Sequence, residues 1–182
     1  MARGERERPV RRRAQVAVLV AVFGMLAGCG ESGEKREYAV PDALCGVSVG
    51  SGLVAPFLPG GKGLKVHEER PVPSRRMCRL DVAGKWAFMA NLEWWADDVS
   101  VATVAGANPQ LGKESHVSAD SAFFYSGTGA VVRVKGCSSP GHAGHTLYTS
   151  LRVRDADLGD PAAMKKLATA YTKAVKRTDA CA

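Results

Sequence analysis

The sequence predicts an α+β fold, in which an antiparallel sheet is packed by N-terminal and C-terminal helices and held by two disulfides. Residues 77–95 and 146–154 alternate apolar and polar side chains, as half-buried antiparallel strands do. Residues 161–175 repeat apolar side chains at helical spacing behind Asp160, a capping residue, and Pro161, which suits a first helical turn. Helices at both ends around such a sheet make an α/β sandwich.

The chain begins with the parts of a secretory signal. Residues 11–13 are arginines, and residues 14–26 are apolar except for Gln15. The apolar run is too short for a membrane-spanning helix, which needs about 20 residues. We therefore expect export, and the Arg12-Arg13 pair leaves both Sec and twin-arginine export open.

Leu26-Ala27-Gly28-Cys29 closes the apolar run and resembles the lipobox of bacterial lipoproteins. In that family a diacylglyceryl group, with acyl chains such as palmitate, is attached to the cysteine sulfur, and a peptidase cuts just before the cysteine. The resemblance implies that residues 1–28 are a cleaved signal peptide and that Cys29 carries lipid. Because two acyl chains anchor stably, we expect a lipoprotein of the cell envelope on the extracytoplasmic face of the membrane. An ordinary cleaved signal and an uncleaved anchor are the alternatives.

Much of the basic charge of the chain belongs to this signal. The formal net charge is +7 at pH 7, and residues 1–28 hold six arginines and two glutamates. Residues 29–182 therefore keep +3, which argues against a nucleic-acid partner. Residues 29–38 are charged and contain glycine, which predicts a flexible tether behind the lipidated cysteine. Residues 39–182 have the size of one globular domain.

The other cysteines predict a disulfide plan. Apart from Cys29 there are four, and an even number in an exported chain indicates two disulfides. Three pairings are open. We favour Cys45 with Cys78 and Cys137 with Cys181, because each bond would then join a terminal helix to a nearby strand.

The first half of the domain divides into a helical segment and strands. Residues 41–58 predict one or two short helices interrupted by glycines, and residues 64–68 an edge strand. Residues 77–95 predict a hairpin with the three-residue loop 82–84, because Leu80 and the even-numbered residues of the second strand share one face only across an odd loop. This places Leu80 opposite Trp86 and Cys78 opposite Phe88.

The second half is predicted to hold a short helix, three strands and the closing helix. Residues 100–107 form the short helix behind Ser100, and residues 111–120 are a loop. The strands are residues 122–125, 130–135 and 146–154, the last with Leu147, Thr149, Leu151 and Val153 inward and Tyr148, Ser150, Arg152 and Arg154 outward. The closing helix buries Met164, Leu167, Ala168, Tyr171 and Val175.

The folded part resembles small disulfide-bonded lipoproteins and secreted proteins of actinobacteria whose function is unknown. The resemblance is carried by Leu44-Cys45-Gly46, by Cys78-Arg79-Leu80 and by Cys181 behind an amphipathic helix. Some of these proteins look similar to the Mog1 and PsbP α/β/α sandwich. The resemblance implies a fold and no catalytic residue.

Trp94-Trp95-Ala96-Asp97-Asp98 is the first candidate binding segment. Consecutive indoles on a strand point to opposite faces, so Trp95 leaves the face that the even-numbered residues bury. An exposed Trp95 beside Asp97 and Asp98 would stack on a sugar ring while the carboxylates accept its hydroxyls. The alternative, which we favour, is that a helix covers Trp95.

His142 and His145 are the second candidate, a metal-binding or acid–base pair in a glycine-rich loop. A metal site with Cys137 fits no standard zinc spacing. An enzyme would need these histidines or His116 to converge with a carboxylate in a cleft. We favour a solvated loop and predict no metal and no cofactor.

Two classes of function follow. The first is a non-catalytic binding or interaction module of the envelope, whose partner is an envelope protein, a cell-wall glycan or a small ligand. The second is a small extracytoplasmic hydrolase or metal-dependent enzyme that uses His142 and His145. We prefer the first, since residues of catalytic type are few and form no known motif. The basic face of the last helix is a further candidate for anionic lipid or wall polymers, or is simply solvated.

Overall fold

The computed structural model describes residues 35–112 and 115–181, and Cys29 and the signal lie outside these residues. The chain from Gly33 to Ala182 forms a compact unit of its own. In the described ranges, no helix combines the length and the apolar character that crossing a membrane requires.

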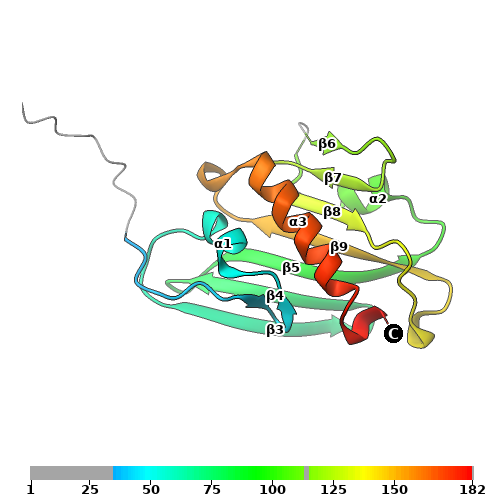
Figure 1. The fold of residues 1–182 in the computed structure, drawn as a ribbon, viewed down its shortest axis with the longest axis horizontal. Helices are drawn as coiled ribbons and strands as arrows, with labels where there is room; N and C mark the ends of the chain where they lie inside the picture. Colours follow the sequence, from blue (N-terminus) through cyan, green and yellow to red (C-terminus); the bar gives the residue numbers. More distant parts are fainter. Residues whose placement is uncertain (1–34, 113–114, 182) are drawn as a thin grey trace, which may run out of the picture. The chain divides into compact units, whose positions relative to one another are not determined.

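A seven-stranded antiparallel sheet is the centre of the fold (Figure 1). The strand order is β3-β4-β5-β9-β8-β7-β6, so β9 joins the β3–β5 meander to the β6–β8 meander. The strands are β3 Leu64–Val72, β4 Arg75–Val82, β5 Lys85–Ala96, β6 His116–Val117, β7 Phe123–Tyr125, β8 Gly129–Arg133 and β9 His145–Val153. The predicted α+β class and antiparallel sheet are confirmed. The predicted edge strand is longer than expected, and the short β6 lies within the predicted loop 111–120.

The segment before the sheet differs from its prediction. Its first half is a hairpin of β1 (Ala43–Leu44) and β2 (Val47–Ser48), and only its second half is helical, in α1 (Ser51–Val54) and η1 (Ala55–Phe57). Cys45 and Gly46 have φ of 46° and 85°, the left-handed pair of a two-residue hairpin turn. The prediction of helix over residues 41–48 is therefore wrong.

The β4–β5 hairpin also closes differently. Its loop is the two residues Ala83 and Gly84, both at positive φ, so the predicted three-residue loop is wrong. A bulge shifts the register after Leu80. Because of this extra residue, Leu80 still shares a face with the even-numbered residues Phe88, Ala90 and Leu92 although the loop has an even length. The observed partners are Leu80 with Phe88, Cys78 with Ala90 and Asp81 with Trp86. Phe88, Ala90 and Leu92 are buried on one face, as the alternation predicted.

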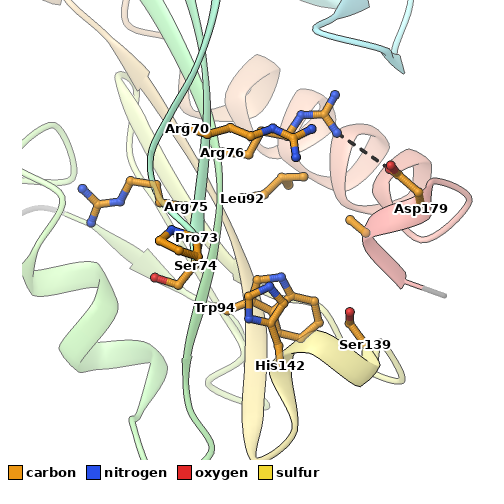
Figure 2. A pocket seen from close by; sticks show the side chains of 11 residues that line it. Arg70, Pro73, Ser74, Arg75, Arg76, Leu92, Trp94, Ser139, His142 and Asp179 are labelled. Atoms are coloured by element: carbon orange, nitrogen blue, oxygen red, sulfur yellow. Dashed lines mark ion pairs between the residues drawn. The ribbon is translucent and has the colours of Figure 1, made fainter.

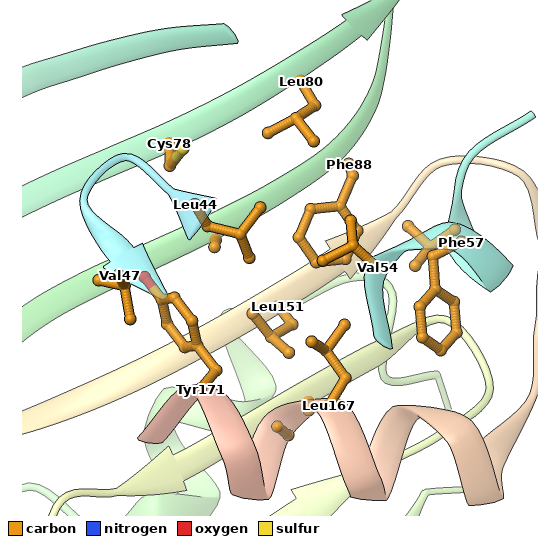
Figure 3. Packing of buried hydrophobic residues seen from close by; sticks show 14 of the residues in the cluster. Leu44, Val47, Val54, Phe57, Cys78, Leu80, Phe88, Leu151, Leu167 and Tyr171 are labelled. Atoms are coloured by element: carbon orange, nitrogen blue, oxygen red, sulfur yellow. The ribbon is translucent and has the colours of Figure 1, made fainter. Parts of the chain in front are cut away.

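Helix α3 (Pro161–Val175) covers that face of the sheet and builds the main core (Figure 3). Asp160 caps it by accepting the backbone N–H of Ala163 at 2.9 Å. The whole predicted stripe is buried: Met164, Leu167, Ala168, Tyr171 and Val175. Leu44 and Phe57 from the N-terminal segment close the same cluster, so the short hairpin and η1 take the place of a longer helix.

Helix α2 (Val101–Gly106) covers part of the other face. Ser100 caps it by accepting the Thr103 backbone N–H at 3.1 Å, as predicted. Tyr148 is fully buried beside Val104, and its hydroxyl donates to the Val99 carbonyl at 2.8 Å. The prediction that Tyr148 and Ser150 face solvent is therefore wrong, because a helix covers a face of β9 that the alternation marked as polar.

Both predicted disulfides are confirmed, Cys45–Cys78 and Cys137–Cys181. The first joins the β1–β2 turn, not a helix, to β4. The second joins the segment after β8 to η4 (Asp179–Cys181), behind α3. Two disulfides indicate a domain that folds outside the reducing cytoplasm.

Candidate functional site

A small pocket forms where three distant parts of the chain meet (Figure 2). One wall is the β3–β4 turn, the floor is the end of β5, and the other wall is the segment of η2 (Pro140–His142) together with η4. The Cys137–Cys181 bond holds η4 beside the start of the segment that leads to η2. The cavity has a volume of about 160 Å³. We call it the Trp94 pocket.

The aromatic part of the pocket is a stacked pair. The Trp94 indole and the His142 imidazole lie with ring centroids 4.7 Å apart and planes within 12° of parallel. Figure 2 shows the two rings overlapping below the arginines. Both side chains are half-buried, so the pair is fixed by packing while it stays open to the pocket.

Arg76 is the best-held cation of the pocket. Its Nε lies 2.9 Å from Glu68 Oε1, and its Nη2 donates to the Cys45 carbonyl at 2.6 Å. Its Nη1 lies 3.8 Å from the exposed carboxylate of Asp179, the ion pair drawn in Figure 2. Arg76 therefore links the β1–β2 turn, the edge of the sheet and η4.

The two other arginines are more open. Arg75 Nε lies 3.0 Å from the buried Glu93 carboxylate, and Arg70 reaches Glu68 at 3.5 Å. Their side chains are 43% and 68% exposed, and each guanidinium has five N–H donors, so donors remain for a ligand. Arg75 and Glu93 pair on the α2 face of the sheet, whereas Glu68 and Asp179 face Arg70 and Arg76, so the pocket is close to neutral overall.

The other predicted indole, Trp95, lies on the opposite face of β5. It is half-buried against the α2 cluster, and its Nε1 donates to Glu93 at 3.2 Å. The structure thus favours the covered arrangement for Trp95. Asp97 is exposed and accepts the Thr146 hydroxyl at 2.7 Å, and Asp98 is exposed. The alternation predicted that Trp94 is buried with the other even-numbered residues, whereas the structure leaves it half-buried in the wall of the pocket.

The structure brings His142 and His145 near each other and leaves His116 in a different part of the sheet. His142 and His145 lie edge to face with centroids 6.3 Å apart, and His116 stacks on Tyr125 in the β6–β7 pair. Within residues 35–112 and 115–181, no three His, Cys, Asp or Glu side chains gather as metal ligands would. Ser139 and Asp179 line the pocket with His142, but no hydrogen bond between side chains joins these three described residues.

Comparisons with protein-family models, with curated proteins and with solved structures find no match to this chain. The pocket itself combines stacked aromatic rings, guanidinium donors and carboxylate acceptors around a space for one small group.

Proposed function

We propose that the chain is an envelope lipoprotein, anchored through lipid on Cys29, and that its domain binds a cell-wall glycan in the Trp94 pocket. The stacked Trp94–His142 pair beside charge-balanced arginines is the observation that carries the ligand assignment. The domain acts as a binding module, held at the extracytoplasmic face of the membrane while it reaches the wall.

Export and anchoring are supported by two independent features. The lipobox-like segment ends at Cys29, and the four remaining cysteines pair with one another. Their pairing leaves Cys29 as the one cysteine of the chain outside the disulfides, as a lipid-bearing cysteine has to be. Mass spectrometry of the protein extracted from membranes tests this part: the N-terminal peptide should begin at Cys29 and carry a diacylglyceryl group, and an unmodified Cys29 would contradict it.

The pocket chemistry favours a sugar over a strongly anionic ligand. An indole face packs on the C–H face of a sugar ring, and guanidinium and carboxylate groups donate to and accept from its hydroxyls. A phosphate would have to compete with Glu68 and Asp179 for Arg70 and Arg76. The volume is below the range of about 300–1,000 Å³ for drug-sized ligands, which suits one sugar unit of a longer chain.

Calorimetric titration of residues 33–182 with soluble cell-wall fragments tests the ligand. We expect binding, and a loss of about 10-fold in affinity for Trp94→Ala, equivalent to about 1.4 kcal/mol of stacking. The matched control is Trp86→Ala, since Trp86 lies at the start of the same strand, about 27 Å from Trp94, beside Arg154. Equal losses in both variants, or no binding by the wild-type domain, would contradict the proposal.

A hydrolase is the second candidate, because Ser139, His142 and Asp179 line the same pocket. The hydrolase is tested with the same cell-wall fragments, which are recovered after the titration and whose masses are measured by mass spectrometry. Intact fragments support a binding module. Shortened fragments whose formation stops with His142→Ala would make the domain an enzyme.

A further inference from the structure

A second, chemically different groove runs along α3 on the side of β7 and β8. Its floor is apolar, with Phe123 and Val132, and its rim carries Lys135, Lys173 and Lys176. The groove has a volume of about 430 Å³, within the range of small-molecule sites. Figure 1 shows α3 lying over the sheet with β8 and β7 alongside it. We call this site the α3 groove.

The charge along this helix has a single sign. Between Asp160 and Asp179 the chain has no acidic residue, and its basic residues are Lys165, Lys166, Lys173, Lys176 and Arg177. A helix face that is merely solvated usually mixes both signs at spacings of three and four residues. Neither Lys173 nor Lys176 forms an ion pair with a described residue. The groove therefore presents two uncompensated ammonium groups above an apolar floor.

The rim on the strand side is arranged by one ion pair. Lys135 Nζ lies 2.6 Å from Asp120 Oδ2. This ion pair, together with the hydrogen bond that the Ser118 hydroxyl donates to Asp120, holds the pKa of Asp120 well below its usual range. Further along the helix, Lys165 Nζ lies 5.6 Å from the ring centroid of Tyr125. This cation–π pair lies beyond the residues that line the groove.

We propose that the α3 groove binds an anionic phospholipid of the membrane, with the phosphate at Lys173 and Lys176 and the first methylenes on Phe123 and Val132. The apolar floor distinguishes this ligand from a wall polyphosphate, which has charge but no chain to bury. Lysine donors suit a phosphate as point charges, whereas the charge-balanced arginines of the Trp94 pocket do not leave such a surplus.

The distance to the membrane supports this ligand, and this step rests on the proposed lipid at Cys29. The folded part begins at Arg36, whose guanidinium donates to the Leu58 carbonyl at 2.6 Å and whose backbone bridges to Gly61. Six residues lie between Cys29 and Arg36, and the seven Cα-to-Cα steps of a fully extended chain span at most about 25 Å. An anchored Cys29 therefore keeps the domain within reach of lipid headgroups.

Vesicle co-sedimentation of residues 33–182 tests the inference without using the anchor, because this unit lacks Cys29. The vesicles are pure phosphatidylcholine or phosphatidylcholine with 30 mol% phosphatidylglycerol. We expect binding to the second kind alone, and a loss on the order of 100-fold in partition coefficient for K135Q/K173Q/K176Q. The matched control is K62Q/K65Q/K85Q, which removes the same charge from exposed lysines of the β3–β5 region.

The outcomes separate the alternatives. The site is supported if the partition coefficient falls at least 10-fold more in K135Q/K173Q/K176Q than in K62Q/K65Q/K85Q. Equal losses would show general electrostatic adsorption and overturn it. Release of the domain by inorganic phosphate equimolar with the anionic lipid, or preference for a soluble wall polyphosphate over the vesicles, would assign the groove to a free anion or a wall polymer instead. Failure of wall-fragment binding in the Trp94 pocket leaves these results unchanged, so the two proposals fail separately.

Discussion

Replacing Cys137 and Cys181 together with alanine removes the bond that holds η4 beside the wall of the Trp94 pocket. The two cysteines are 44 residues apart in sequence. In the chain-entropy account, opening a loop of this size restores freedom to the unfolded state that lowers the free energy of unfolding by about 4 kcal/mol at 25 °C. The same relation gives about 3.7 kcal/mol for Cys45–Cys78, whose cysteines are 33 residues apart.

Urea unfolding of residues 33–182, followed by far-UV circular dichroism, measures these losses. We expect C137A/C181A and C45A/C78A to lose similar amounts, with the first slightly larger. The wild-type domain under reducing conditions should be less stable than either variant measured under oxidising conditions, because it loses both bonds. A loss below about 1 kcal/mol for C137A/C181A would refute the reasoning, since it would mean that the bond restricts neither the unfolded chain nor the fold.

Three further predictions concern the core, the pH dependence and one glycine. Leu167→Ala should lower the free energy of unfolding by about 2–5 kcal/mol in the same urea assay, because Leu167 is fully buried between α3 and the sheet; a smaller loss would place it outside the core. Burial raises the pKa of Tyr171, so the unfolded chain ionises first. Stability is therefore full below about pH 10 and falls above it by up to about 1.4 kcal/mol per pH unit, and Tyr171→Phe should flatten this fall in unfolding curves at pH 9 to 11. Gly129→Ala should cost about 1–3 kcal/mol, because a Cβ there would lie 2.8 Å from the Gln110 carbonyl carbon. Gly52→Ala, which meets no atom within 4 Å, is its control and should not destabilise.

Capping residues and the alternation of apolar side chains predicted the elements that are determined by residues close together in the sequence. Asp160 and Pro161 mark the start of α3, and the alternation in β5 and β9 marks the faces that pack on it. The β4–β5 loop shows the limit of parity: a two-residue turn with a bulge and a three-residue turn both bury Phe88, Ala90 and Leu92, but the bulge places Trp86 opposite Asp81 and leaves it half-buried. The hairpin at Cys45 was missed because a non-glycine residue at positive φ is uncommon.

The features that sequence reasoning missed depend on contacts between distant segments. Tyr148 is buried because α2 returns over β9, and nothing in the alternation of β9 indicates that helix. The Trp94 pocket combines β5, the β3–β4 turn and η4, which meet only in the folded chain. The predicted pairing of Cys137 with Cys181 was the one feature of the sequence that indicated η4 lies near the segment before β9.

The indole region of a two-dimensional ¹H–¹⁵N spectrum tests the glycan-binding claim most directly. The chain has three tryptophans, Trp86, Trp94 and Trp95, each with one indole N–H signal that Trp→Phe variants assign. Addition of soluble wall fragments should shift the Trp94 signal in a saturable way and leave the Trp86 signal in place. A saturable shift of Trp86 with Trp94 unchanged, or no shift at all, would contradict the assignment of the pocket.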